Sequence, residues 1–405
     1  ASTCTISPAS ALPQITTDGI TIDGYSQSGA LANAASWPDA LDGTIKIEID
    51  GTNAGASVYG IDINNVNNTI LKGLAIYDFD NSGIYIQNTS TGARIQGSYI
   101  GVHADGTSTG PNGDTNGVYT GNSVSGAYIG TDGDGTNEAA ERNIFNHDLR
   151  LGGQTTVSGN YFGVGKDGIT QIKTNQSKNI FLQSNSSNSI IGTNGDGVSD
   201  SVEGNVFGWA SHGITLWIVN NVTIAGNYIG VDRTGLTSSD LDYGVYTYIA
   251  GSSIIGTNND GQSDTLERNI ISGNTIDGIR FSTDSTNNTI AGNYIGVGYD
   301  GTTDLGNLTH GIYLLNNAAD NTIGGVDAES VNVIAYNGDA ASEYGVYIDD
   351  ADTDANRILR NSFFSNQNEG IYLEGNGAND NQIQPVIITN QTNGSNQDVI
   401  GTTEA

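Results

Sequence analysis

Acidic and amide side chains recur at matching positions in three glycine-rich segments. The segments read YIGTDGDGTNEAAERNIF (128 to 145), IIGTNGDGVSDSVEGNVF (190 to 207) and IIGTNNDGQSDTLERNII (254 to 271). Carboxylate and amide oxygens on a curling glycine loop are typical ligands of hard cations such as Ca²⁺. The alignment therefore predicts structural calcium sites, with the ligands Asp132, Asp134, Glu138, Glu141, Asn194, Asp196, Asp200, Glu203, Asn258, Asp260, Asp264 and Glu267.

The same segments allow a simpler interpretation. Asp-Gly pairs are typical of solvated turns in which the carboxylate only sets the backbone geometry. The spacing also departs from the EF-hand loop, because the glutamate required at the twelfth position of that loop is not in place. Both interpretations stay open, and the three aligned copies favour calcium.

The segments belong to a regular repeat. A block of the form Gly-x-Tyr-Ile/Phe-Gly-Val recurs at intervals of 62, 67 and 66 residues, and the acidic segments share this period. Short runs of the form Gly-Ile/Val-x-Ile/Leu fall between them, mostly 31 to 34 residues apart, so that each unit holds three apolar runs. Three strands per unit predict an all-β, right-handed parallel β-helix of about eleven coils.

Proline placement agrees with this fold. Residues 112 to 384 contain no proline, as expected where every strand is central in a sheet and must donate to its neighbour. We expect one continuous domain: a capping or joining region with the first strands over 1–58, the β-helix over 59–385, and a polar tail or cap over 386–405.

The middle residue of each Gly-Ile/Val-x-Ile/Leu run should point outward, because side chains alternate along a strand. Eleven such positions hold seven aromatic residues, which are Tyr85, Tyr119, Phe181, Tyr246, Tyr313, Tyr347 and Tyr372. Stacked at strand spacing, they would form a contact strip for sugar rings or for another subunit. The alternative is that they only stabilise the sheet as cross-strand pairs.

Charge and cysteine content limit the partners. The 44 acidic and 13 basic residues give a net charge of −31, which excludes binding to nucleic acid through its phosphates. No apolar stretch approaches the length of a membrane span, about 18 residues. The single cysteine, Cys4, has no partner within the chain, so we expect it to be free or to join another chain.

A family resemblance points to a location. TISPASALPQITTDGITIDGYSQSGA (5 to 30), IEIDGTNAGAS (47 to 57) and the GNYIGV and IGTNGDGVSD blocks resemble secreted bacterial β-helix repeat proteins of the CSLREA-associated type. The resemblance covers nearly the whole chain. It implies a secreted, cell-surface protein without an established common activity.

Two functions follow from these features. We expect a non-catalytic extracellular structural protein, either a cell-surface stalk or adhesin or a subunit that assembles end to end into a fibre or sheath. The alternative is a β-helix that binds or cleaves a surface polysaccharide along the aromatic strip. The Gly-His-Gly and Arg-Ile-Lys motifs of polygalacturonases are absent, so we predict no catalytic residue.

Overall fold

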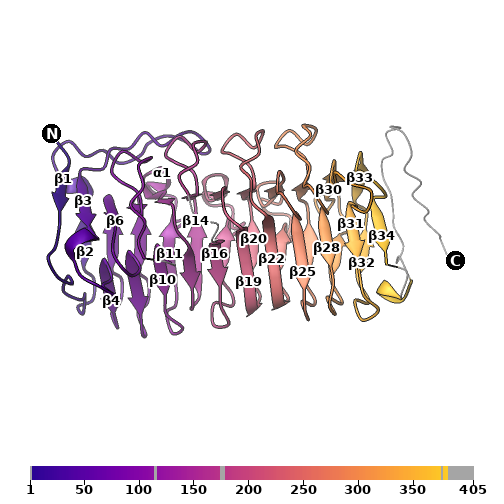
Figure 1. Ribbon diagram of the computed structural model, residues 1–405, viewed down its shortest axis with the longest axis horizontal. Helices are drawn as coiled ribbons and strands as arrows, with labels where there is room; N and C mark the ends of the chain where they lie inside the picture. The colour runs from indigo at the N-terminus through magenta and orange to yellow at the C-terminus, as the bar shows by residue number, and fades with distance from the viewer. Residues whose placement is uncertain (1, 114–115, 174–177, 375–376, 382–405) are drawn as a thin grey trace.

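The protein is an elongated solenoid built from three parallel sheets (Figure 1). The structure is a computed structural model and describes residues 2–113, 116–173, 178–374 and 377–381. The tail predicted over 386–405 lies outside the described residues. Strands climb from β1 at one end to β34 at the other, and the chain visits the sheets in the same order in each coil.

In the described part of the chain, sheet A has 12 strands and sheets B and C have 11 each. Sheet A contains β1 (Cys4–Ile6), β3 (Ile47–Asp50), β6 (Leu74–Tyr77), β9 (Tyr99–Ile100), β12 (Ile144–Phe145), β15 (Tyr161–Phe162), β18 (Val206–Phe207), β21 (Tyr228–Ile229), β24 (Ile270–Ile271), β27 (Tyr294–Ile295), β30 (Val333–Ala335) and β33 (Ser362–Phe364). Sheet B contains β4 (Ile61–Asn64), β7 (Ile84–Gln87), β10 (Val118–Thr120), β13 (Leu149–Leu151), β16 (Lys178–Leu182), β19 (His212–Asn220), β22 (Tyr243–Gly251), β25 (Ile279–Ser282), β28 (Ile312–Leu314), β31 (Val346–Ile348) and β34 (Ile371–Leu373). Sheet C contains β2 (Thr21–Asp23), β5 (Ile70–Lys72), β8 (Arg94–Gln96), β11 (Ala127–Gly130), β14 (Thr155–Ser158), β17 (Ile190–Gly192), β20 (Thr223–Ala225), β23 (Ile254–Gly256), β26 (Thr289–Ala291), β29 (Thr322–Gly324) and β32 (Arg357–Leu359).

Every paired strand in these sheets runs parallel to its neighbours, so the predicted right-handed parallel β-helix is confirmed. Helical structure is confined to the short helix α1 (Glu138–Glu141) and four 3₁₀ turns in the described residues: η1 (Gly24–Ser26), η2 (Gly51–Asn53), η3 (Asp200–Val202) and η4 (Ala378–Asn381). A membrane-spanning helix is not found among the described residues.

Aliphatic and phenylalanine side chains fill the interior of the coils. Inward positions of sheet B, such as Ile214 and Val245, are completely buried. On sheet A the rings of Phe145, Phe162 and Phe207 stack through three successive coils, with centroids 4.8 and 4.9 Å apart. Burial of apolar surface contributes about 25 cal/mol per Å², so this continuous core supplies the main stabilisation of a fold without disulfides.

Buried asparagines line the corners between the sheets. The longest ladder lies at the corner between sheets C and A, where each fully buried asparagine bonds to the one in the next coil; its members are Asn143, Asn160, Asn205, Asn227, Asn269, Asn293, Asn332 and Asn361. Shorter ladders occupy the other two corners, one through Asn274 and Asn307 and one through Asn288 and Asn321. These amides satisfy main-chain groups that the turns leave without sheet partners.

The glycine of the IIGT sequence permits close contact between coils. Gly192 at the end of β17 has a φ of +99°, and a Cβ at this position would stand 1.8 Å from the carbonyl oxygen of Ala225. Residues with a side chain rarely adopt this backbone conformation, and there is no room for a Cβ at this position. The repeated glycine is therefore required by the spacing of the coils.

The N-terminal region contributes both strands and a strap. After β1 and β2, the segment 27–44 runs along the outside of the rod (Figure 1). Its main chain bonds to later coils, with Leu41 N donating to Lys166 O over 2.7 Å. Trp37 packs against the rings of Tyr161 and Tyr228 and beneath the guanidinium of Arg142. The strap thereby covers part of a second apolar cluster on the outer side of sheet A.

Candidate functional site

The predicted outward strip exists as a continuous ladder on sheet B. The eleven positions pair Cα to Cα without a break, from Asp62 with Tyr85 through Thr215 with Tyr246 to Tyr347 with Tyr372. All seven predicted aromatic residues therefore lie on one face. Ten of the eleven side chains are partly exposed, and Thr215 is buried.

Most rings of the ladder lie against one another. The centroids of Tyr85 and Tyr119 are 5.1 Å apart with an interplanar angle of 12°, and those of Tyr313 and Tyr347 are 4.8 Å apart at 19°. Stacked rings present edges and hydroxyls to solvent. Two of these hydroxyls are already used, since Tyr313 donates to Asp349 and Tyr347 to Glu374. At this end of the strip the contacts are those of cross-strand stabilisation.

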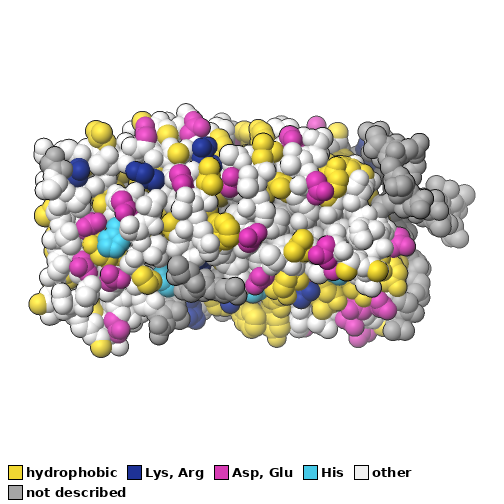
Figure 2. Space-filling model, turned by 45° about the horizontal axis from the view of Figure 1, so that its top comes forward, with side chains coloured by type: hydrophobic (Ala, Val, Ile, Leu, Met, Phe, Trp, Pro, Cys, Tyr) yellow, Lys and Arg dark blue, Asp and Glu magenta, His cyan; other side chains and the backbone are white. Residues whose placement is uncertain are grey.

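In the middle of the strip, two long strands carry exposed aromatic side chains beyond the ladder. β19 and β22 each span nine residues and extend past the ladder. Beyond the ladder they bring Trp217 and Tyr248 into a stack with centroids 4.1 Å apart, while Trp217 is 38% exposed and Ile218 is 43% exposed. Figure 2 shows hydrophobic side chains gathered along the lower edge of the rod, at the position of β19 and β22 along its length.

Trp217 and Tyr248 were not among the predicted contact residues. The prediction ended each strand at the second aliphatic residue of Gly-Ile/Val-x-Ile/Leu. The signal that would have found them is the length of the runs HGITLWIVN and YGVYTYIAG, which contain no turn residue between their two ends apart from the repeat glycine.

Two cations on this face have no carboxylate partner in the described part of the chain. The guanidinium of Arg150 lies between the rings of Tyr119 and Phe181, at 5.3 and 5.9 Å from their centroids, and Lys178 Nζ lies 5.2 Å from the Phe181 centroid. Neither cation forms an ion pair with any described residue, and Arg150 Nε is buried without a hydrogen-bond partner. In a chain of net charge −31, unpaired cations point to an anionic ligand.

A third cation, Arg280, is held in place by its surroundings. Its guanidinium lies 4.8 Å from the ring centroids of both Tyr243 and Tyr313, and its Nε donates over 2.7 Å to Asp277. Asp277 is completely buried and also accepts from the hydroxyl of Thr309. The ion pair of Arg280 and Asp277 is neutral as a whole. Arg280 therefore packs against the aromatic rings of this face without adding net positive charge to it.

The histidines of this face carry little charge near neutral pH. Burial, together with the nearby Lys178 and Arg280, lowers the pKa of His212 to about 4. Burial also lowers the pKa of His310, whose Nδ1 accepts a hydrogen bond from the main-chain N–H of Tyr344. The positive charge of the strip therefore comes from Arg150 and Lys178.

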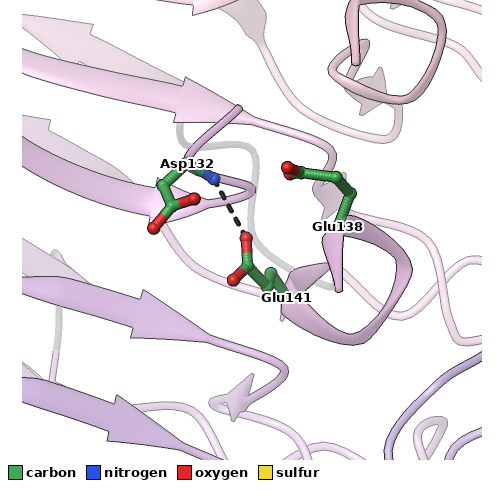
Figure 3. Close-up of side chains that lie close together, drawn as sticks. All are labelled: Asp132, Glu138 and Glu141. Atoms are coloured by element: carbon green, nitrogen blue, oxygen red, sulfur yellow. Dashed lines mark hydrogen bonds between the residues drawn. The ribbon is translucent and has the colours of Figure 1, made fainter. Parts of the chain in front are cut away.

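The acidic segments form loops at the corner between sheets C and A. In the first loop, one carboxylate oxygen each of Asp132, Glu138 and Glu141 lie within 4.8 Å of one another. Figure 3 shows Glu138 and Glu141 reaching from α1 toward the turn that carries Asp132, whose main-chain N–H donates to Glu141. Burial and the charges of Asp132 and Glu138 raise the pKa of Glu141 to about 8.

The second and third loops have the same backbone plan with different contacts. Asn194 and Asn258 replace the first aspartate, and their main-chain N–H groups donate to Glu203 and Glu267. In the second loop, Asp200 accepts from the hydroxyl of Thr193 and from a main-chain N–H. The pKa of Glu203 rises to about 7, chiefly through burial.

The remaining predicted ligands set turn geometry. Asp134, Asp196 and Asp260 are exposed, and each accepts from the main-chain N–H two residues ahead. Of the twelve predicted ligands, the structure thus brings three acids into one group, all in the first loop. The assignment of calcium stays a prediction at this point.

An exposed thiol and a cleft lie outside the strip and the acidic loops. Cys4 lies in β1 with an exposed, free thiol, and its link to another chain stays a prediction. On the outer side of sheet A, a cleft of about 620 Å³ opens beside Trp37 of the strap and is also lined by Tyr228, Arg268 and Tyr299. The sequence did not predict this cleft, because the strap that forms one wall lies far from the other residues in the chain.

Comparisons with known proteins show similarity in solved structures alone: no family model matches the chain, and no curated protein matches it. The periplasmic alginate epimerase AlgG is similar over 84% of this chain and 67% of its own, at 13% identity and a TM-score of 0.40. Its T265N mutant is similar over 86% and 64%, at 11% identity and a TM-score of 0.41. The A-module of the Azotobacter vinelandii mannuronan C-5 epimerase AlgE4 is similar over 96% and 91%, at 13% identity and a TM-score of 0.40.

These comparisons correct one expectation. The chain spans about two thirds of the length of the AlgG structures. All three structures are of epimerases of alginate or mannuronan, which are polysaccharides, and not of stalk or fibre proteins. The non-catalytic structural protein expected from the sequence is therefore contradicted, and the polysaccharide alternative is retained. At this level of similarity no activity is transferred to the chain.

Proposed function

We propose that the protein binds an extended, anionic polysaccharide along the outer face of sheet B. The observation that carries this proposal is the pair of cations, Arg150 and Lys178, which lie among aromatic rings without a carboxylate partner among the residues that the structure describes. An uncompensated cation in so acidic a protein favours a ligand that supplies the missing anion.

The shape of the face suits a linear polymer. From β13 to β25 the strip crosses four strand spacings, which is about 20 Å. Along this length Arg150 and Lys178 stand at one side of Trp217, and Arg280 stands at the other. Carboxylate groups along a sugar chain would meet Arg150 and Lys178 while sugar rings contact the exposed indole.

The aromatic and the cationic residues of the face contact different parts of the ligand. The indole of Trp217 has one face against Tyr248, whereas on its other side Phe181 approaches edge-on at 6.3 Å. The exposed part of the indole, 38% of Trp217, offers apolar contact to the C–H groups of a sugar ring. Arg150 is planar and already oriented between two rings, so it binds a carboxylate with little further loss of freedom.

We place this activity outside the cytoplasm. The resemblance to secreted β-helix repeat proteins in the segments 5–30 and 47–57 supports that location. Surface polysaccharides with carboxylate groups would be the ligands met there. The proposal assigns binding alone and no catalytic residue.

Affinity electrophoresis of the purified chain through gels that contain polygalacturonate, alginate or neutral dextran tests the proposal. We expect retardation by the anionic polymers and none by dextran. Trp217→Ala should weaken binding at least fivefold, since a central aromatic anchor carries much of the energy of such a surface.

Tyr299→Ala is the matched control. Tyr299 is a 62% exposed aromatic residue at the sheet A cleft, away from the strip, and its loss should leave the mobility unchanged. Weaker binding with Tyr299→Ala and normal binding with Trp217→Ala would assign the ligand to the cleft and overturn the proposal. Equal retardation by dextran would overturn the requirement for anionic groups.

A further inference from the structure

We propose that the first acidic loop, and neither of the other two, holds one Ca²⁺ ion, with Thr131, Asp132, Glu138 and Glu141 as its protein ligands. This inference does not depend on polysaccharide binding. Its starting point is the group of three carboxylates in Figure 3, which supply oxygens within 4.8 Å of one another.

The first independent observation is an oxygen without a partner. The side chain of Asp132 is only 7% exposed, yet its buried Oδ1 has no hydrogen-bond donor. Arg94 Nε donates over 2.7 Å to Oδ2 and leaves Oδ1 unsatisfied. A buried carboxylate oxygen needs a donor or a cation.

The second independent observation is the hydroxyl of Thr131. Thr131 is completely buried, and its Oγ1 has no hydrogen-bond partner. In the other loops the equivalent hydroxyls of Thr193 and Thr257 donate to Asp200 and Asp264 over 2.9 and 3.0 Å. The hydroxyl of Thr131 is therefore free to bind a cation, whereas the hydroxyls of Thr193 and Thr257 already donate to carboxylates of their own loops.

The orientation of Thr131 follows from its methyl group. Its Cγ2 faces Gly159, as Cγ2 of Thr193 faces Gly226 in the second loop. Because the methyl groups point the same way, the hydroxyls do as well, and Oγ1 of Thr131 is directed into the acidic loop. A hydroxyl oxygen in this position is available as a cation ligand.

The three loops differ in charge as well as in hydrogen bonding. The first loop places three carboxylates in the group, whereas Asn194 and Asn258 supply amides in the other two. These amides donate their N–H groups to Asp196 and Asp260. They hold the carboxylates of their own loops, so those loops need no ion.

Calcium fits the available oxygens better than magnesium. Four protein oxygens leave about two to four positions for water in the coordination shell of six to eight that Ca²⁺ takes. Mg²⁺ demands a tighter octahedron, about 2.1 Å from metal to oxygen. Glu203 of the next loop lies so close to Gly133 that it adds further negative charge beside the site.

Isothermal titration of the chelator-treated full chain with CaCl₂ tests the inference. We expect one saturable site per chain, with binding at least tenfold weaker for Mg²⁺. Asp132→Asn should weaken Ca²⁺ binding at least tenfold. Thr131→Val keeps the methyl packing and removes only the free hydroxyl, so it should weaken binding severalfold without lowering the melting temperature in EDTA.

Asp200→Asn in the second loop is the matched control and should leave Ca²⁺ binding unchanged. Absence of saturable binding at millimolar Ca²⁺ would overturn the inference. So would a stoichiometry of three, or binding that both Asp132→Asn and Thr131→Val leave intact. Should Asp132→Asn fail to fold, the Thr131→Val titration decides alone.

Discussion

The side-chain amide of Asn205 donates a hydrogen bond of 2.9 Å to Oδ1 of Asn227 in the next coil. The same amide donates over 2.9 Å to the carbonyl oxygen of Val157, and Oδ1 of Asn205 accepts from the side chain of Asn160. Asn205 is thus one step of a hydrogen-bonded ladder that joins coils through a corner where no strand pairing exists.

Loss of one step should destabilise the fold strongly. Asn205→Ala leaves buried donors and acceptors in two neighbouring coils without partners, and each such group costs about 1–3 kcal/mol. We expect the free energy of unfolding to fall by about 2–4 kcal/mol, measured by urea denaturation followed by circular dichroism. Asn53→Ala, at an exposed asparagine, should change it by less than about 0.5 kcal/mol. Equal effects would mean that the ladder does not stabilise the corner.

Thr215 interrupts the aromatic ladder, and replacing it should increase the stability of the protein. It is 1% exposed and its Oγ1 has no hydrogen-bond partner. Thr215→Val keeps the shape, suits a strand and removes the unsatisfied hydroxyl. We expect a gain of about 1 kcal/mol in the free energy of unfolding. A loss of stability would indicate that a bound water satisfies the hydroxyl.

Glu267 makes stability depend on pH. Its pKa is raised mainly by burial, with a further contribution from Asp264, despite hydrogen bonds from Thr257 and Asn258. The folded-state pKa of Glu267 lies above that of the unfolded chain, which is about 4.3. The protonated carboxyl of Glu267 therefore contributes fully to the free energy of unfolding at pH values below the unfolded-state pKa. This contribution is lost as the pH rises through the raised folded-state value.

Glu267→Gln keeps an oxygen that accepts from the main-chain N–H of Asn258, a bond of 3.0 Å in the native protein. We therefore expect the variant to melt at a higher temperature than the native chain at pH 8, and at the same temperature near pH 4. Thermal unfolding across this range provides the measurement. A deficit for the variant at pH 8 would show that the ionised carboxylate stabilises the loop.

Arg150 should make polysaccharide binding sensitive to salt. Raising the ionic strength from about 0.05 M to about 0.5 M shortens the screening length severalfold, so affinity should fall. Arg150→Ala should lower both the affinity at low salt and the slope of its salt dependence. Arg150→Lys should recover only part of the affinity, because an ammonium does not lie flat between Tyr119 and Phe181.

Arg357→Ala provides the charge-matched control for these titrations. Arg357 is exposed in β32 of sheet C, so its loss changes the net charge by the same amount on another face. We expect binding close to that of the native chain. An equal reduction by Arg357→Ala and Arg150→Ala would indicate that net charge alone governs binding, which would contradict a specific role of the strip.

The sequence alone determined the fold and the register of the strip. The repeat length sets one coil, and alternation along a strand sets which side chains point outward. Both are local properties, so the pairing of Tyr85 with Tyr119 and of Tyr313 with Tyr347 could be predicted without knowledge of any contact. The acidic loops were located for the same reason, because their residues are close together in the chain.

Only the tertiary structure decided how these residues differ from one another. Among the described residues, Arg150 has no ion-pair partner, Thr131 has a free hydroxyl while Thr193 does not, and Trp217 stays exposed beside Tyr248. These properties depend on contacts with side chains in neighbouring coils or across a loop. A repeat pattern makes aligned positions look equivalent, whereas burial and hydrogen bonding differ at each coil, and these determine which copy has oxygens or charges left to bind a ligand.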